Sequence, residues 1–391
     1  MKSNIKNAIS ISQFKSDYFH FIPWRNLFIF FLILIAPGCI RQFIPAVSQD
    51  QNLLVVEGTI TDQPGMNTIN ISTSMPLGKR SQVKPLAGCN VYLTDDLGNK
   101  IMLSENTEGS YSCDPSFQGV VGRSYTIHVK TNSLNSELSY QSSPVLMRPV
   151  PDIDSVYWER VVFARDLYNW PIAEGAKIFL STHDPLNSCR YYRWEYVETW
   201  EFTLPFYVAN KTCWVTNKSN DINIKNTSSL ADDRIEKFPI NFITNATDRL
   251  KIKYSILVNQ YALNEEEYAY WEKLRNTTQE VGGLYDLIPE SIPSNITCIE
   301  KPDERVLGYF SVSSVKSKRI FIKSQFNGTA NLYGDCVNAL GSKTEIIPGL
   351  NDYVWIIGES LYGYTLTYFR GCADCTDRGS TAVPPFWYDS K

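Results

Sequence analysis

The sequence predicts a mostly-β protein with two β-rich domains of unequal size, and three observations support this prediction. The composition is that of an ordinary globular protein, with 43% hydrophobic and 20% charged residues among 391. Short runs rich in β-branched and aromatic residues recur along the chain, separated by Gly, Pro and Asn. Only one stretch, near residues 265–276, has the period of an amphipathic helix. At roughly 150 residues per domain, this length favours two domains.

Residues 1–38 have the features of a secretory signal peptide. Arg25 precedes the uncharged run LFIFFLILIA, which would span about 15 Å as a helix, half of a bilayer core. Cys39 follows Ala-Pro-Gly, and this arrangement resembles the lipobox of bacterial lipoproteins, in which the cysteine is lipidated after cleavage. The alternatives are an ordinary signal peptide and an uncleaved anchor. We expect a protein anchored through Cys39, with residues 39–52 as a tether.

Residues 53–148 are expected to form a small antiparallel sandwich. Strand-like runs begin at LLVVEGTITD and recur every 10 to 15 residues, and CNVYLTDDLGNKIML has the pattern of a hairpin. About 100 residues of short strands is the size of an Ig-like or transthyretin-like β-sandwich. His128 alternates with apolar neighbours on one such strand, and we interpret it as an ordinary strand residue rather than a metal ligand.

A proline-containing boundary at 148–151 precedes a larger β-rich domain over residues 152–391. Its clearest strand, 191–203, alternates aromatic with polar residues, so one face should be buried. The aromatic face comprises Tyr192, Trp194, Tyr196, Trp200 and Phe202, and the polar face comprises Arg193, Glu195, Thr199 and Glu201. Glu198 lies on the aromatic face, and a salt-bridged carboxylate is the favoured interpretation over a functional one.

The one convincing helix is expected near residues 265–276. Asn264 is a suitable N-cap, and Glu265, Glu266 and Glu267 in the first turn match the helix dipole. Tyr268, Trp271 and Leu274 then follow at helical spacing. The three glutamates would also suit a cation, but their match to the helix dipole is the simpler interpretation.

Eight cysteines follow Cys39, and an even number in an oxidising compartment predicts four disulfides. They are Cys89, Cys113, Cys189, Cys213, Cys298, Cys336, Cys372 and Cys375. Their order suggests Cys89–Cys113 and Cys189–Cys213, each closing a loop of about 25 residues that contributes about 3 kcal/mol. The last four cysteines allow three pairings. The Cys372-Ala-Asp-Cys375 motif also matches a redox or zinc site, but it follows a strand and lacks a second close pair.

The sequence carries no common catalytic or cofactor-binding motif. Nucleophile elbows, P-loops, dinucleotide-binding glycines and zinc-protease helices are all missing. Beyond Cys39 the only histidines are His128 and His183, and His183 lies in the turn-like Ser-Thr-His-Asp-Pro. The net charge of −4 gives no basic footprint for nucleic acid. We therefore expect no enzyme, cofactor, metal or nucleic-acid partner, although carboxylate-pair hydrolysis needs no motif and stays open.

Several segments beyond Cys39 together resemble one family. They are LVVEGTITDQPG (54–65), CNVYLTDDLGN (89–99), PDIDSV (151–156), YYRW (191–194), GGLYD (282–286), VLGYFSVSSV (306–315) and CADCTDRGSTAVPPFW (372–387). These segments resemble the Bacteroidota outer-membrane lipoproteins catalogued as domain of unknown function 4249. The family has no established catalytic residues, so the resemblance transfers none.

The resemblance implies an accessory subunit at the outer membrane, on either its periplasmic or its surface face. Such a protein would assist a TonB-dependent β-barrel transporter by capturing or gating a small-molecule, glycan or peptide ligand. The alternatives are an independent adhesin or glycan-binding lipoprotein and, more remotely, a cryptic hydrolase. The 9 Trp and 23 Tyr offer aromatic faces for sugars, peptides or proteins, although aromatics on strands are mostly core.

Overall fold

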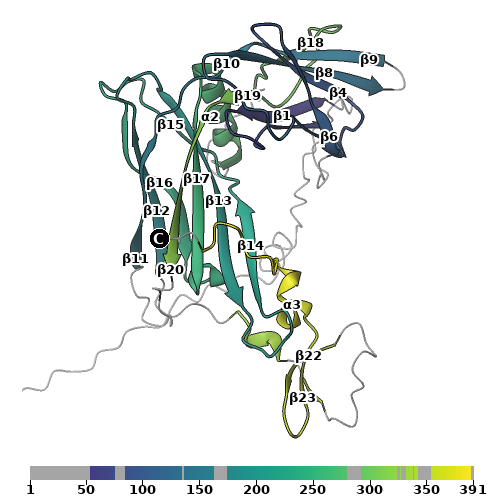
Figure 1. The fold of residues 1–391 in the computed structure, drawn as a ribbon, viewed down its shortest axis with the longest axis vertical. Coiled ribbons are helices and arrows are strands. Elements are labelled where there is room, and N and C mark those ends of the chain that lie inside the picture. Colours follow the sequence, from purple (N-terminus) through teal and green to yellow (C-terminus); the bar gives the residue numbers. More distant parts are fainter. Residues whose placement is uncertain are drawn as a thin grey trace, which may run out of the picture. The chain divides into compact units, whose positions relative to one another are not determined.

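The computed structural model describes residues 53–74, 84–133, 136–162, 174–279, 292–323, 326, 332–337, 339–341 and 354–388. These residues form five β-sheets and one long helix (Figure 1), so the predicted mostly-β class is confirmed. The predicted signal peptide, the tether and Cys39 lie outside the described residues. Within the described ranges, no helix is long and apolar enough to cross a membrane.

Two sheets form the first sandwich. One sheet contains β19 (Phe310–Ser313), β1 (Leu54–Thr61), β2 (Thr68–Thr73), β7 (Ser110–Ser112) and β6 (Ser104–Thr107) in that order, with β3 (Lys84–Pro85) beside β2. The other contains β18 (Ile296–Cys298), β9 (Ser136–Ser142), β8 (Ser124–Ser133), β4 (Asn90–Asp95) and β5 (Lys100–Met102), with β10 (Val145–Leu146) beside β8. Alternate residues such as Val56 and Ile60 point inward because side chains alternate along a strand, and they share one buried cluster with Leu93 and Ile127 of the facing sheet.

The first sandwich is discontinuous in sequence. Strand β19 pairs in parallel with β1, with Gly58 opposite Phe310, and β18 pairs antiparallel with β9. The predicted boundaries, with a sandwich over 53–148 and all later residues in a second domain, therefore need correction, because residues 296–298 and 310–313 belong to the sandwich sheets. Periodicity along a strand reports which face is buried and does not report which strand lies beside it.

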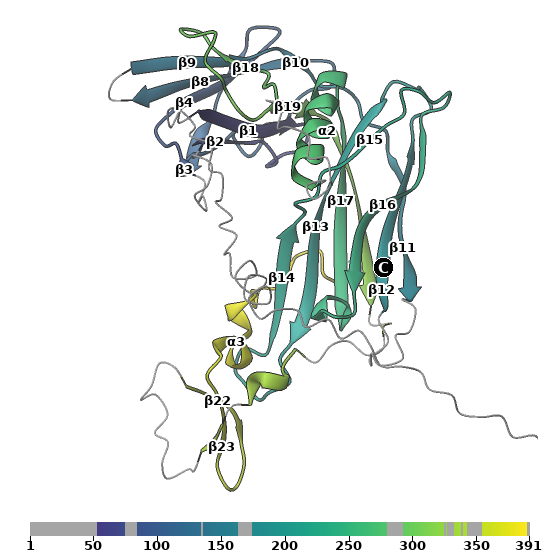
Figure 2. The same ribbon diagram turned by 180° about the vertical axis from the view of Figure 1, so that it is seen from behind.

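Two further sheets pack face to face in the second domain (Figure 2). One comprises β11 (Ile153–Val162), β12 (Glu174–His183) and β16 (Arg234–Thr244). The other runs β14 (Thr212–Lys218), β13 (Tyr191–Thr203), β17 (Lys253–Ala262) and β20 (Val315–Lys323), with β15 (Asn223–Asn226) also beside β13. The predicted strand 191–203 is β13, and its aromatic face is buried as expected, with Tyr192 and Trp194 both 0% exposed. A single turn of 3₁₀ helix, η1 (Asp248–Leu250), precedes β17.

The C-terminal part of the described chain is small and cross-linked. Its sheet has the order β21 (Ala339–Gly341), β23 (Tyr364–Thr367) and β22 (Trp355–Glu359), accompanied by η2 (Gly334–Cys336), α3 (Arg370–Ala373) and η3 (Cys375–Asp377). The tail then returns to the second domain, where the Trp387 indole is buried and donates to Oε2 of Glu201 at 3.1 Å. The guanidinium of Arg319 lies 3.5 Å from the centre of the Phe386 ring.

The disulfides differ from the predicted pairs. Cys213 bonds Cys375, and Cys336 bonds Cys372. The predicted pairs Cys89–Cys113 and Cys189–Cys213 are therefore wrong. Four cysteines, Cys89, Cys113, Cys189 and Cys298, have no disulfide partner among the described residues. Pairing by order along the chain failed because the tail crosses back to β14, and the sequence separation of 162 residues gave no local signal of this contact.

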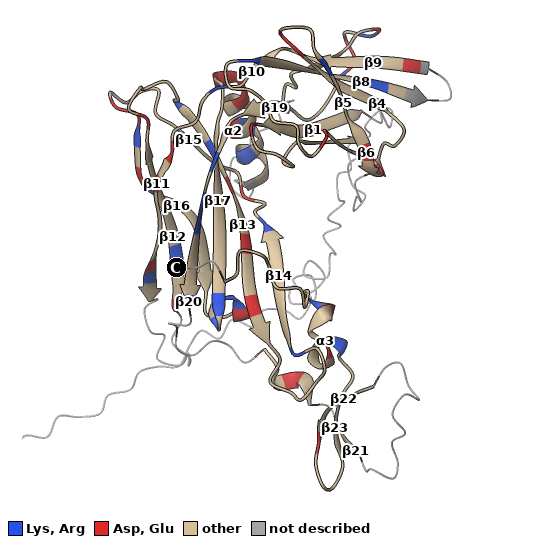
Figure 3. Cartoon of the chain, viewed as in Figure 1, with Lys and Arg blue, Asp and Glu red and all other residues tan. Residues whose placement is uncertain are grey.

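The predicted helix is α2 (Glu265–Gln279), which extends three residues past the expected end. It begins where Oδ1 of Asn264 accepts the Glu267 backbone N–H at 2.7 Å, as the predicted N-cap requires. Both views place α2 near strands of each sandwich, beside β19 and beside the end of β13 (Figures 1 and 2). Figure 3 shows Lys and Arg scattered among Asp and Glu along the described elements rather than gathered in one region.

Candidate functional site

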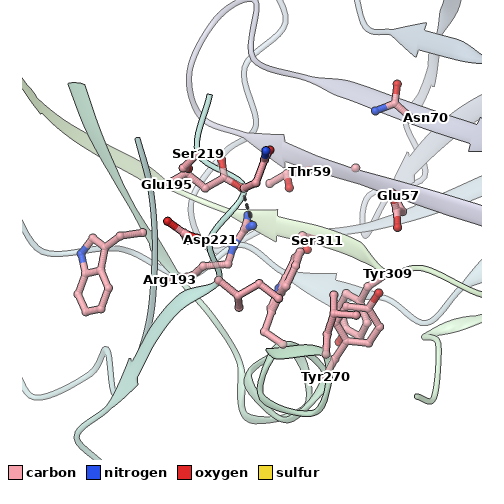
Figure 4. Close-up of a pocket in the computed structure, with 16 residues that line it drawn as sticks. Glu57, Thr59, Asn70, Arg193, Glu195, Ser219, Asp221, Tyr270, Tyr309 and Ser311 are labelled. Atoms are coloured by element: carbon pink, nitrogen blue, oxygen red, sulfur yellow. Dashed lines mark hydrogen bonds and ion pairs between the residues drawn. The ribbon is translucent and has the colours of Figure 1, made fainter. Parts of the chain in front are cut away.

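A cleft of about 460 Å³ lies among β1, β2 and β19 of the first sandwich, β13 of the second domain, and α2 (Figure 4). The segment Ser219–Ile222, between β14 and β15, forms a further wall. The volume of the cleft falls within the range of small-molecule sites, about 300–1,000 Å³. Because the walls come from elements more than 250 residues apart in sequence, only the folded chain assembles this cleft.

Arg193 is the central cation of the cleft. Its side chain is only 7% exposed, and Nη1 donates to Oε1 of Glu195 at 2.6 Å. The guanidinium lies 4.4 Å from the centre of the Trp271 ring and 4.8 Å from the centre of the Tyr261 ring. Arg193 belongs to the predicted polar face of β13, but α2 covers that end of the strand, so the arginine is buried. Nε of Arg193 has no hydrogen-bond partner among the described residues.

Glu267 connects α2 to the first sandwich beneath the cleft. Its Oε1 accepts from Oγ of Ser311 at 2.6 Å and from Nε1 of Trp271 at 3.2 Å. Burial raises the pKa of Glu267, while the nearby Arg193 opposes that rise. From the sequence, a match to the helix dipole was preferred over a cation site for this glutamate, whereas in the structure it is 1% exposed and accepts a hydrogen bond from the Trp271 indole.

Carboxylates and amides surround the open side of the cleft. Glu57 and Asn70 come from the first sandwich, and Asn220 and Asp221 come from the Ser219–Ile222 segment. This segment is fixed to β13, because the backbone N–H of Tyr196 donates to Oγ of Ser219 at 2.9 Å. The rim therefore presents both hydrogen-bond donors and acceptors at fixed positions.

Two tyrosines form the apolar wall opposite Arg193. The rings of Tyr270 and Tyr309 lie 4.8 Å apart, and Tyr270 also meets Trp271 edge to face at 5.4 Å. Burial, reinforced by the charges of Glu57 and Glu267, raises the pKa of Tyr270 to about 12. Burial also raises the pKa of Tyr309. Both phenols are therefore neutral hydrogen-bonding groups at neutral pH.

This arrangement is suited to binding. It combines aromatic walls, a buried arginine and polar side chains at the rim, and its lining residues include no histidine or cysteine. Across the described ranges, no group of three His, Cys, Asp or Glu side chains is placed to hold a metal ion.

The two histidines and Glu198, which the sequence offered as candidate functional residues, lie outside the cleft. Nδ1 of His183 is 2.7 Å from a carboxylate oxygen of the half-exposed Asp154. His128 stacks on Tyr92 with ring centres 4.7 Å apart, and burial lowers its pKa. Glu198 forms a salt bridge with Nη1 of Arg249 at 3.1 Å, as predicted. The cleft itself was not predicted, although Arg193, Glu195 and Trp271 had been placed on the correct faces of their elements.

Comparison with known proteins identifies a family. A family model described as domain of unknown function (DUF4249) matches residues 40–319. Among curated proteins, none shows significant similarity to this sequence. A two-domain fibronectin type-III segment from chicken tenascin is similar to 54% of this chain and 91% of its own length, with 13% identity and a TM-score of 0.14. The fold described above rests on the strand pairing and not on that weak likeness.

Proposed function

The chain belongs to the DUF4249 family, and we propose that it is a lipid-anchored envelope protein that captures a ligand for an outer-membrane transporter. In this proposal residues 1–38 are a lipoprotein signal peptide, and Cys39 carries the lipid. The partner is a TonB-dependent β-barrel, and the protein is an accessory subunit rather than an enzyme.

The cleft is the observation that carries this proposal. A ligand-capturing subunit needs a preformed concave site with an apolar wall and a few placed polar groups. Trp271, Tyr270 and Tyr309 supply the wall, and Arg193 is already fixed by its ring contacts. Such pre-organisation reduces the entropy that a bound ligand must lose.

The proposed anchor supports a membrane partner. The 14 residues of the tether, 39–52, reach at most about 50 Å when extended. A lipidated protein shares a surface with any transporter in the same membrane, and confinement raises the effective concentration of one partner around the other. Weak contacts between the two proteins then suffice to hold a complex.

The test is a mild-detergent pull-down of the tagged full-length protein from its native membrane, followed by mass spectrometry. We expect a TonB-dependent barrel in stoichiometric amount. Cys39→Ala is the matched control, because it removes the thiol that carries the lipid and should therefore not recover the barrel. A lipidated protein that purifies alone, even after crosslinking, contradicts the accessory role.

An independent glycan-binding lipoprotein is the second candidate, and the aromatic and amide lining of the cleft favours it. Under this alternative the anchored protein binds polysaccharide without any barrel. Turnover of a bound oligosaccharide would instead contradict the non-enzymatic assignment.

A further inference from the structure

We infer that the cleft takes an uncharged, hydroxyl-rich ligand of the carbohydrate class. This inference rests on the proposed function, which gives the cleft a capturing role, and it adds the chemistry of what is captured. Three features of the described residues lead to it: a guanidinium with unused donors, carboxylates that exclude anions, and strands that offer no free edge.

The first feature is the incomplete hydrogen bonding of Arg193. A guanidinium carries five N–H donors in a planar fork, and here Nη1 donates to Glu195 while Nε has no acceptor among the described residues. Trp271 and Tyr261 both contact the guanidinium, and together with Glu195 they fix the fork before a ligand arrives. Figure 4 shows Arg193 directed between Glu195, Asp221 and Ser311. A buried polar group without a partner is costly, and a ligand oxygen beside this fork would relieve that cost.

The second feature is the sign of the charge around that donor. Glu57, Glu195 and Asp221 line the same cleft, while Arg193 is the only Lys or Arg among its lining residues. A carboxylate or phosphate ligand would be repelled by these acids, because like charges brought together cost several kcal/mol of binding. The acceptor that meets Arg193 is therefore a neutral oxygen, and the rim carboxylates accept from donors on the same ligand. A hydroxyl group supplies both the neutral acceptor oxygen and the hydrogen-bond donor.

The third feature is the pairing of the strands. A peptide often binds by adding a strand to an open sheet edge. Strand β1 has β2 on one side and β19 on the other, and β13 has β17 on one side and β14 and β15 on the other. Strand β19 is the edge of its sheet, but the backbone N–H and C=O of Phe310 bond the side chain of Asn295, and Ser313 forms a bridge with Arg148. The walls therefore offer side chains rather than unpaired backbone, which favours a sugar over an extended peptide. Asn70 and Asn220 can donate and accept, and the Trp271 ring offers an apolar surface for the C–H face of a sugar ring.

The experiment uses the full-length protein in mild detergent on an array of neutral oligosaccharides, followed by calorimetric titration of the trisaccharides that bind. We expect at least one neutral glycan to bind. Its counterparts carrying uronic acids should bind at least tenfold more weakly, and tri-lysine should not compete for the site.

Two variants assign the binding to the cleft. Trp271→Ala and Asn70→Ala should each weaken the affinity for the bound trisaccharide at least tenfold, whereas Trp271→Phe should retain most of it. Asn217→Ala, an exposed residue on β14 outside the cleft, is the matched control and should bind as the wild type does. The thermal unfolding temperature of each variant shows whether it is folded.

Three results overturn the inference: binding of no neutral glycan on the array, preferential binding of acidic glycans or tri-lysine, or glycan binding unchanged by both cleft variants. None of these results affects the pull-down of the barrel, so failure of the ligand class and failure of the accessory role can be told apart.

Discussion

Two buried carboxylates, Glu198 and Glu267, show how single residues in this protein differ in their surroundings. Glu198 accepts from Nη1 of Arg249 at 3.1 Å and from the Tyr254 hydroxyl at 2.8 Å. Glu267 accepts from two neutral donors and has only the nearby charge of Arg193. Glu198 is therefore directly paired with a cation, whereas Glu267 depends on hydrogen bonds in a largely dehydrated position.

Glu198→Ala should destabilise the protein by about 2 kcal/mol, because it leaves the buried Tyr254 hydroxyl and Arg249 without their acceptor. Urea unfolding measures the change. Glu236→Ala is the control, since Glu236 forms an exposed ion pair with Arg234 at 3.7 Å and should cost less than about 1 kcal/mol. Equal effects of the two substitutions would contradict the assignment of Glu198 as a structural ion-pair partner.

Glu267→Gln should alter how stability depends on pH. The pKa of Glu267 is raised in the folded state, so the folded protein retains a proton that the unfolded chain releases near pH 4.5. Stability contributed by this residue is therefore present below that pH and declines as the pH rises through the folded-state pKa. Glutamine keeps an acceptor for Ser311 and Trp271 without this titration.

The measurement compares unfolding midpoints of wild type and Glu267→Gln between pH 4 and pH 8. We expect the stability of the variant relative to wild type to increase with pH across that window. A constant difference would show that Glu267 does not titrate with a raised pKa.

At the residue scale, the sequence predicted the face on which each side chain lies better than its environment. Arg193 was correctly assigned to the polar face of its strand, but its burial depends on α2, which begins about 70 residues later. Glu267 matched the helix dipole as predicted, yet its contact with Ser311 comes from a strand that belongs to the first sandwich and not to the second domain. Alternation within one element carries no information about what covers that element.

At the scale of elements, the parallel pair β1–β19 depends on a close approach at Gly308. This residue has a φ of +86°, and an added Cβ would lie 2.2 Å from the carbonyl oxygen of Val56. Only glycine adopts this conformation readily and also leaves room for the neighbouring backbone. The loop before β19 therefore requires glycine for two separate reasons.

Gly308→Ala should cost at least about 2 kcal/mol, combining left-handed strain with a backbone clash. Gly98→Ala is the matched control, because Gly98 has a φ of +82° but nothing within 4 Å of an added Cβ. That substitution should cost only the conformational term, about 1 kcal/mol. Thermal unfolding of both variants tests the difference, and a loss at position 308 no larger than that at 98 would argue against the tight β1–β19 contact.

Elements with a local signal were predicted well. Strand β13 followed from its alternation, and α2 followed from Asn264 and the spacing of its aromatics. Strands β18 and β19 are short, and no local pattern indicates that they join the first sandwich. The cleft forms only because β19 joins the first sandwich, so the position of the cleft could not be predicted from local sequence patterns.

For the whole molecule, the disulfides attach the C-terminal tail to the second domain. Cys213–Cys375 links residues 162 positions apart, and the tail continues to the buried Trp387. A cross-link that closes so long a loop removes much conformational freedom from the unfolded chain. The pairing predicted from chain order joined Cys213 to Cys189 and therefore gave no bond between β14 and this tail.

Non-reducing peptide mapping by mass spectrometry should therefore find Cys213 joined to Cys375 and Cys336 joined to Cys372. After denaturation without reductant, Cys89, Cys113, Cys189 and Cys298 should react with an alkylating reagent. The double variant Cys213→Ser/Cys375→Ser should lose about 2–5 kcal/mol of stability. Recovery of a Cys189–Cys213 peptide would contradict the structure.

The discontinuous first sandwich also constrains the order in which the chain can fold. Strand β1 begins at Leu54, but its parallel neighbour ends at Ser313, so about 250 residues must emerge before the sheet closes. One hydrogen-bonding edge of β1 therefore stays unpaired until residues 310–313 have been made. An unpaired strand edge is prone to aggregation, and a chaperone that shields it until β19 arrives would be of direct benefit. A fragment ending at residue 148 should accordingly fail to fold, and the two domains should mature together rather than in succession.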